Sequence, residues 1–269
     1  MRKIGIRYYD DLLTDESFRE MAEGGMTATE LCCVREPLKL NFKKVREYAD
    51  RYGINLWSCH LPFRGEADTV QETAEQRQHM LELQKTLISR ATDIGVDKFV
   101  IHPSCVIKPT IDREEAKKHA MEVLDDLAEF AYARGARIAV ENMVVSCLGN
   151  TCQELLEMVG INEKLRICFD VNHLLLDDHM SFAERVKDKL ITVHITDYDF
   201  VQERHWFPGE GKIDWPKVYG KLCEIGYEGA WIYELSPGVK NDMRSRELTV
   251  RDFYNNAMEI FEGKQPGRI

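Results

Sequence analysis

Histidines and carboxylates recur at the ends of short apolar runs in this chain, and they are the residue types that bind divalent metals in proteins. Six short apolar runs each end on one of them: Trp57-Ser-Cys-His60, Phe99-Val-Ile-His102, Ile138-Ala-Val-Glu141, Ile167-Cys-Phe-Asp170, Ile191-Thr-Val-His194 and Trp231-Ile-Tyr-Glu234. Such runs, alternating with longer helical stretches, are typical of parallel strands buried on both faces. In a parallel barrel the C-terminal strand ends share one mouth. Crowded there, these groups would repel or stay unpaired without a cation, so the pattern predicts a metal enzyme.

Three more side chains can join this group. His173 comes three residues after Asp170 and can face the same pocket, while Glu203 and His205 alternate and so share one side of an extended loop. Nitrogen and carboxylate oxygen donors together suit Zn, Mn, Fe or Co better than Ca.

Single histidines have a simpler interpretation, which stays open for two of the strand ends. His60 and His102 could be hydrogen-bonded structural histidines as readily as metal ligands. His79, His119 and His179 are expected to be solvated residues of helices or loops.

A repeating strand–helix unit without a linker positions these residues. Strands are expected at residues 3–8, 29–33, 55–60, 98–102, 137–141, 167–170 and 229–234, with a further strand that ends at residue 196. Helices are expected at about residues 15–22, 67–93, 112–134, 152–159, 215–225 and 243–262, with a further helix that begins after residue 41. Residues 172–180 are expected to form an acidic loop. The order indicates an α/β chain whose natural closure is a (β/α)8 TIM barrel, with residues 1–269 as a single domain. A doubly wound open sheet is the alternative, but no Gly-rich phosphate turn follows the first strand.

Composition favours a cytoplasmic protein. The chain has 269 residues, 44% of them hydrophobic, enough for a large core. It contains no stretch of about 18 uncharged apolar residues, so no membrane span is expected, and its start leaves no room for a signal peptide. Its eight cysteines include no CxxC pair and are expected to be reduced, mostly buried thiols. The formal charge of −10 argues against a nucleic-acid partner without excluding one.

Several short motifs carry a resemblance. Val140-Glu-Asn142, Asp170-Val-Asn-His173, Val193-His-Ile-Thr-Asp197, Arg204-His205 before Pro-Gly-Glu-Gly, and Tyr233-Glu234 resemble the xylose-isomerase-like TIM-barrel superfamily. That group includes ketose 3-epimerases, sugar isomerases, inosose dehydratases and zinc-dependent abasic-site endonucleases. The resemblance spans nearly the whole chain and is specific for the superfamily more than for a substrate.

The resemblance implies a metal site and two mechanisms. In epimerase-like members one divalent ion (Mn, Zn, Co or Mg, with a second ion possible) is held at positions matching Glu141, Asp170, His194 and Glu234, and His173 matches a residue that contacts substrate hydroxyls. Glu141 and Glu234 would then act as acid and base on a ketose or related polyol through an enediolate, giving epimerisation or isomerisation, or dehydration if a β-hydroxyl is lost.

In endonuclease-like members further ligands build a three-zinc site that attacks a phosphodiester, and His60, His102 and His173 are available here. Glu203-Arg-His205 stands where those members carry a D-x-H pair, and the longer glutamate puts a third metal in doubt. The mouth loops mix charges, as in Arg35-Glu36, and they are short for a duplex-binding enzyme, which favours the sugar enzyme. Phe63, Trp206 and Phe207 could line a small pocket or simply pack onto the barrel. A barrel that binds without turnover is a third interpretation, and a homo-oligomer is possible.

Overall fold

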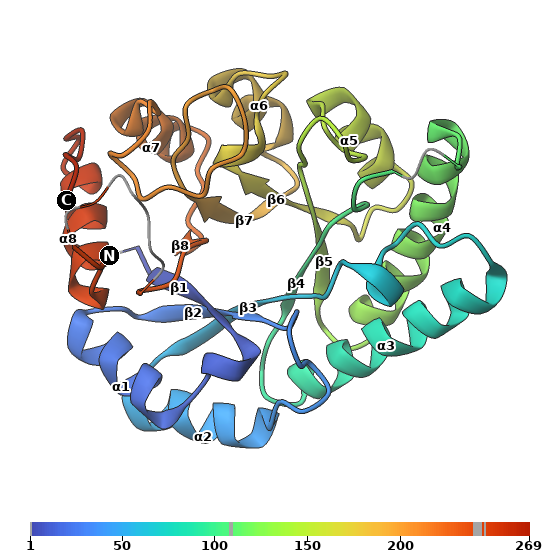
Figure 1. Ribbon diagram of the computed structural model, residues 1–269, viewed down its shortest axis with the longest axis horizontal. Helices are drawn as coiled ribbons and strands as arrows, with labels where there is room; N and C mark the ends of the chain where they lie inside the picture. The colour runs from blue at the N-terminus through green and yellow to red at the C-terminus, as the bar shows by residue number, and fades with distance from the viewer. Residues whose placement is uncertain (1, 108–109, 239–243, 245) are drawn as a thin grey trace.

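Eight parallel strands close into a barrel in the computed structural model, which describes residues 2–107, 110–238, 244 and 246–269 (Figure 1). The strands pair in chain order, and β1 closes the ring against β8. They are β1 Ile4–Tyr9, β2 Ala28–Cys32, β3 Asn55–His60, β4 Lys98–Ile101, β5 Arg137–Glu141, β6 Arg166–Asp170, β7 Leu190–Ile195 and β8 Trp231–Tyr233. The predicted (β/α)8 TIM barrel is therefore confirmed, and the open-sheet alternative is wrong.

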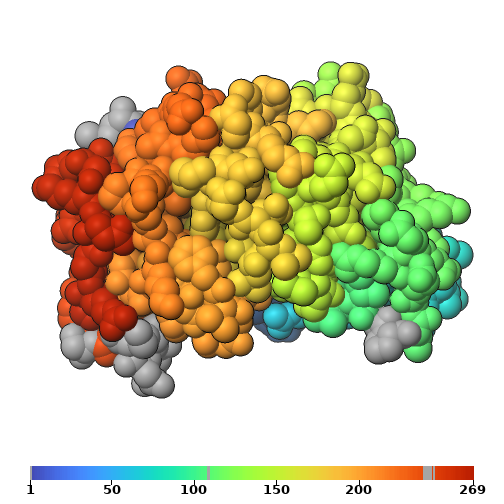
Figure 2. Space-filling view, turned by 90° about the horizontal axis from the view of Figure 1, so that it is seen from above, coloured from blue at the N-terminus to red at the C-terminus, as the bar shows by residue number. Residues whose placement is uncertain are grey.

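A layer of helices surrounds the barrel and covers its apolar outer face. Those of the described residues are α1 Asp15–Gly24, α2 Phe42–Tyr52, α3 Ala74–Thr92, α4 Arg113–Tyr132, α5 Cys152–Gly160, α6 His179–Val186, α7 Trp215–Glu224 and α8 Val250–Phe261. Along one side of the molecule they follow one another in chain order, from red α8 through orange α7 and yellow α6 to green α4 (Figure 2). Each helix presents its buried residues to the strands, so the core is one continuous layer between sheet and helices.

Helix boundaries follow the caps, and two predicted starts are wrong for that reason. The helix expected from residue 67 begins at Ala74, because Thr73 and Gln76 form a reciprocal capping box there. The last helix begins at Val250, where Thr249 and Asp252 form another capping box. Residues 246–249, which were expected to be helical, therefore precede the helix. The predicted start at residue 243 lies outside the described residues.

One helix was missed altogether. No helix was expected after the acidic segment 172–180, but α6 begins within its last two residues, and its first turn is capped by Asp178, whose carboxylate accepts the amides of Met180 and Ser181. His179 begins this helix and is buried, with Nε2 beside the carbonyl oxygen of Val171 at 2.7 Å, so its predicted solvent exposure is wrong. His79 is exposed as expected, and His119 is half-buried. Among the described residues, no helix is both long and apolar enough to cross a membrane.

Candidate metal centre

The strand ends deliver the predicted side chains to one mouth of the barrel. Every strand from β3 to β8 contributes a residue at or next to its C-terminal end, the short turn Val171–His173 after β6 adds His173, and the loop after β7 adds two more. They are His60, His102, Glu141, Asp170, His173, His194, Glu203, His205 and Glu234. All are buried except Glu203 and His205, which are 39% and 32% exposed.

Four of these residues form a compact group that can hold one ion. Glu141, Asp170, His194 and Glu234 each offer a ligand atom, and these atoms all lie within 4.8 Å of one another. Nδ1 of His194 lies 3.1 Å from Oε1 of Glu141 and 3.9 Å from Oε1 of Glu234. The group contains three carboxylates and one imidazole, the residues that the resemblance assigned to a single divalent ion.

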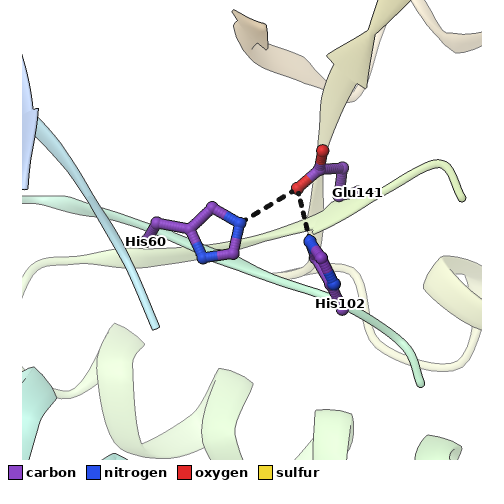
Figure 3. A group of neighbouring side chains, drawn as sticks. All are labelled: His60, His102 and Glu141. Carbon is purple, nitrogen blue, oxygen red and sulfur yellow. Dashed lines mark ion pairs between the residues drawn. The ribbon is translucent and has the colours of Figure 1, made fainter. Parts of the chain in front are cut away.

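Three further groups adjoin this one, and the first, Glu141, Cys168 and His194, shares two of its members. Oε2 of Glu141 lies 3.3 Å from Nε2 of both His60 and His102, so the same carboxylate also belongs to a group with these two histidines (Figure 3). Figure 3 shows both imidazoles turned toward that one oxygen.

The last group consists of His173, Glu203 and His205. Glu203 Oε1 is 3.4 Å from Nε2 of His173 and 2.6 Å from Nε2 of His205. Nδ1 of His173 in turn lies 3.5 Å from both Glu141 and Asp170, so this histidine joins the last group to the four-residue group. The structure thus brings every predicted candidate ligand into one connected cluster.

Carboxylates and imidazoles alternate in the cluster and shift one another's pKa values, and burial lowers the pKa of His102 to about 4 despite the neighbouring Glu141. Burial alone would raise the pKa of Glu141, but His194 and His102 hold it well below its ordinary value. Burial opposes the charge on His173 too, yet Asp170 and Glu203 raise its pKa well above the usual range. Asp170 differs, because burial and the nearby Glu234 and Glu141 raise its pKa well above the ordinary value despite His173.

Unsatisfied atoms indicate that this donor set fits a metal. Buried polar atoms normally have hydrogen-bond partners. Within the part of the chain that the structure describes, several buried atoms of the cluster make no regular hydrogen bond, and all belong to candidate ligands: Nε2 of His60, Nε2 of His102, Oε2 of Glu141, Oδ2 of Asp170, Nδ1 of His205 and Oε2 of Glu234. Cations at these positions would satisfy them, and the mixture of imidazole and carboxylate suits Zn, Mn, Co or Fe.

A buried aspartate fixes the loop that carries Glu203 and His205. Asp197, just after β7, accepts the amides of Tyr198, Gly209 and Ile213 and the indole N–H of Trp215. Its own backbone pairs with that of Trp206. The irregular stretch after β7 is therefore held at both ends, which gives its two ligand candidates a defined position.

Sequence reasoning missed two polar residues deeper in the barrel and one beside the mouth. Arg7 on β1 pairs with Glu234, and Glu30 on β2 points inward to His194. The side chain of Asn142 holds the backbone of Asp170 by two hydrogen bonds of 2.8 Å: its Nδ2 donates to the carbonyl oxygen, and its Oδ1 accepts the amide N–H. An arginine or glutamate inside an otherwise apolar strand was the available signal.

The aromatic residues of the mouth have different roles. Phe63 is half-buried and lies over His102, with ring centroids 3.9 Å apart, so it forms part of the wall. Phe207 is fully buried between Tyr233 and Phe253, as expected for packing. Trp206 is half-buried beside Arg204.

Known proteins share this architecture. An uncharacterised protein of Methanocaldococcus jannaschii is 28% identical over 86% of this chain and 82% of its own length. An inosose isomerase of Bacillus velezensis is 29% identical over 65% of this chain and 61% of its own, and a fructoselysine 3-epimerase of Escherichia coli O157:H7 is 28% identical over 46% and 47%.

Solved structures of similar fold include sugar epimerases and an epimerase-like protein. A D-tagatose 3-epimerase-like protein superposes with a TM-score of 0.81 at 25% identity over 97% of both chains. An L-ribulose 3-epimerase shares the fold, with a TM-score of 0.80 at 16% identity over 97% of this chain and 95% of its own. The family model described as "Xylose isomerase-like TIM barrel" matches residues 18–250. With this match, which covers most of the barrel and its mouth, the chain belongs to the xylose isomerase-like TIM barrel family.

Proposed function

We propose that this chain is a divalent-metal-dependent isomerase or epimerase of a ketose or related polyol. The observation that carries the proposal is the buried four-residue group at the mouth, Glu141, Asp170, His194 and Glu234. The names of the inosose isomerase, the fructoselysine 3-epimerase and the D-tagatose 3-epimerase-like protein support sugar carbon chemistry over other uses of this fold.

The two glutamates of the group are suited to move a proton. They extend from β5 and β8, three strands apart around the ring, so a substrate between them would present a different face to each. Burial would raise the pKa of Glu234, but Arg7 and His205 hold it well below its ordinary value, so both glutamates are ionised and able to accept a proton. One would take the proton next to the carbonyl and the other would return one.

The remaining parts orient and activate the substrate. A bound divalent ion would supply a Lewis acid that polarises the carbonyl and stabilises the enediolate. His173, buried beside Asp170, would orient a hydroxyl, and Phe63 would shield one side of the pocket. Return of the proton to the same carbon gives an epimer, return to its neighbour gives an isomer, and loss of a β-hydroxyl gives dehydration.

Proton exchange tests this proposal before the natural substrate is known. Protein loaded with Mn, Co, Zn or Mg would be incubated in D2O with a panel of ketoses, phosphorylated ketoses and inososes, and the C–H signals next to the carbonyl would be followed by NMR. We expect metal-dependent loss of one such signal, absent in Glu141→Gln. No exchange with any panel member in any metal form would refute the proposal. Cytoplasmic location and homo-oligomer assembly stay predictions alongside it.

Phosphodiester hydrolysis at a zinc cluster is the second candidate. One observation favours it: the groups His60–His102–Glu141 and His173–Glu203–His205 adjoin the four-residue group, so up to three ions have side chains to hold them. Elemental analysis of protein purified without chelators discriminates the two. About one ion per chain favours the sugar enzyme, whereas two or three zinc ions, reduced by His60→Ala and His205→Ala, together with cleavage of abasic DNA, would favour the hydrolase.

A further inference from the structure

A fully buried glutamate lies beneath the four-residue group and contacts one of its members. Glu30, in the middle of β2, has no exposed surface. Its Oε1 and Oε2 lie 3.0 and 3.1 Å from Nε2 of His194, and Ser58 Oγ donates a 2.7 Å hydrogen bond to Oε2. Ser58 is the partner of Glu30 in the register of β2 and β3, so the strand pairing itself places the hydroxyl under the carboxylate.

The two nitrogens of His194 face opposite ways. Nε2 points down the barrel to Glu30, whereas Nδ1 points to Glu141 at 3.1 Å and Glu234 at 3.9 Å. A neutral imidazole has one N–H donor and one lone pair. If the proton is on Nε2, where a carboxylate can accept it, the lone pair of Nδ1 is directed at the other carboxylates of the candidate metal group.

A buried carboxylate at this position needs a reason. Desolvation of a carboxylate costs several kcal/mol in real proteins unless partners compensate, and a hydrophobic residue would fill the barrel at no such cost. His194 and Ser58 contact Glu30 directly, and His60 and Arg7 are further polar or charged groups that interact with it. The hydrogen bond to His194 supplies the reason.

We propose that Glu30 is a positioning residue that holds His194 in the Nε2–H form and makes its Nδ1 a stronger metal ligand, with Ser58 fixing the carboxylate. A carboxylate that accepts the second N–H of a histidine sets its tautomer and raises its basicity as a ligand. The inference rests on the proposed metal-dependent function, and it assigns Glu30 no contact with substrate.

Metal affinity of a graded pair of variants tests it. Glu30→Gln keeps an acceptor oxygen but removes the charge, and Glu30→Met removes both with little change in size. Zinc and manganese dissociation constants would be measured by competition with a chromophoric chelator. We expect Kd to rise about tenfold in Glu30→Gln and toward a hundredfold in Glu30→Met. Asp10→Asn is the matched control, since Asp10 is another buried carboxylate, at the end of β1, that accepts backbone amides of Asp11, Arg35 and Glu36.

Nitrogen NMR of the zinc-loaded protein gives a readout that a merely structural glutamate would not produce. Histidine 15N shifts and their N–H couplings should show His194 protonated at Nε2 and zinc-bound at Nδ1 in the wild type. Zinc bound at Nε2, or Kd values unchanged in both variants, would overturn the proposal. The wild-type spectrum decides the question even if a variant does not fold. If one of these results were found while the wild type still bound metal and turned over substrate, only the role of Glu30 would be refuted and the proposed function would stand. A wild type that binds no metal would refute both the role of Glu30 and the proposed function.

Discussion

Replacing Asp170 by Asn should weaken metal binding while leaving the metal-free protein at least as stable as the wild type. Burial and the neighbouring Glu234 and Glu141 raise the pKa of Asp170 well above its ordinary value, so without metal they favour the protonated form of this side chain. An asparagine resembles that form. Its oxygen can still accept the amide of Asn172, which Oδ1 of Asp170 accepts at 2.6 Å. The amide NH2 takes the place of Oδ2, which makes no regular hydrogen bond in this structure.

The size of the loss follows from the four ligands of the group. Structural zinc sites of four ligands contribute about 10–16 kcal/mol at neutral pH, so an even share is about 2.5–4 kcal/mol for each ligand. That corresponds to an increase in Kd of about two to three powers of ten.

Glu234→Gln removes the same charge from the same group but should behave differently without metal. Glu234 is the partner of Arg7, and the two side chains are 3% and 12% exposed. Breaking a buried ion pair costs about 3–5 kcal/mol, which at about 2–4 °C per kcal/mol lowers the melting temperature by about 6–20 °C.

Two measurements on both variants separate these effects. Thermal unfolding in EDTA reports the stability of the metal-free chain, and chelator competition reports Kd. Asp170→Asn should combine an unchanged or higher Tm with weaker metal binding, and Glu234→Gln should lower both Tm and affinity. If Asp170→Asn melted well below the wild type in EDTA and still bound metal with wild-type affinity, both the protonation and the ligand assignment would be wrong.

Three further predictions concern activity, pH and the mouth loop. Glu141→Gln should abolish turnover with an unchanged far-UV circular dichroism spectrum, and full activity in that variant would refute its role. Against the lowering effect of burial, Glu234 and Glu203 raise the pKa of His205 to about 9. Protonation of His205 stabilises the folded state fully below about pH 6.5, which is the pKa of histidine in the unfolded chain, and no longer does so above about pH 9. The Tm of the metal-free protein should therefore fall between these pH values, and saturating metal should suppress the fall. A rising Tm over that range would contradict this. Gly211→Ala should lower Tm, because a Cβ there would lie 2.3 Å from Asp197 Oδ1, while Gly220→Ala, with open space on the exposed face of α7, should raise stability by up to about 1 kcal/mol in denaturant titrations.

Cap chemistry explains where sequence reasoning placed helices wrongly. The Thr73 and Thr249 boxes are visible in the sequence, since each is a threonine with a glutamine or aspartate three residues later. The prediction relied on helical periodicity alone and therefore placed both helix starts before these threonines. The helix α6 was missed because it has only 8 residues, too few for its buried Phe182 and Val186 to establish a period.

The barrel and the residue types at its mouth could be predicted from the order of the amino acids alone. Apolar runs ending on histidine or carboxylate require buried parallel strands, and parallel strands in a closed ring bring their C-terminal ends together whatever the loops do. His60, Glu141 and Asp170 could therefore be assigned to one mouth before any coordinate was known.

The direction in which individual strand residues point could be known only from the folded chain. The same holds for which groups of candidate ligands lie next to one another. A strand buried on both faces has no polar face from which to read its orientation, so Arg7 and Glu30 could have faced the helices or the barrel axis. Loop residues such as Glu203 and His205 depend on distant anchors, here Asp197 and its hydrogen bonds, which no local pattern encodes. The inner contact between Glu30 and His194 arises because strands far apart in the sequence close into one ring, and that closure is a property of the whole chain.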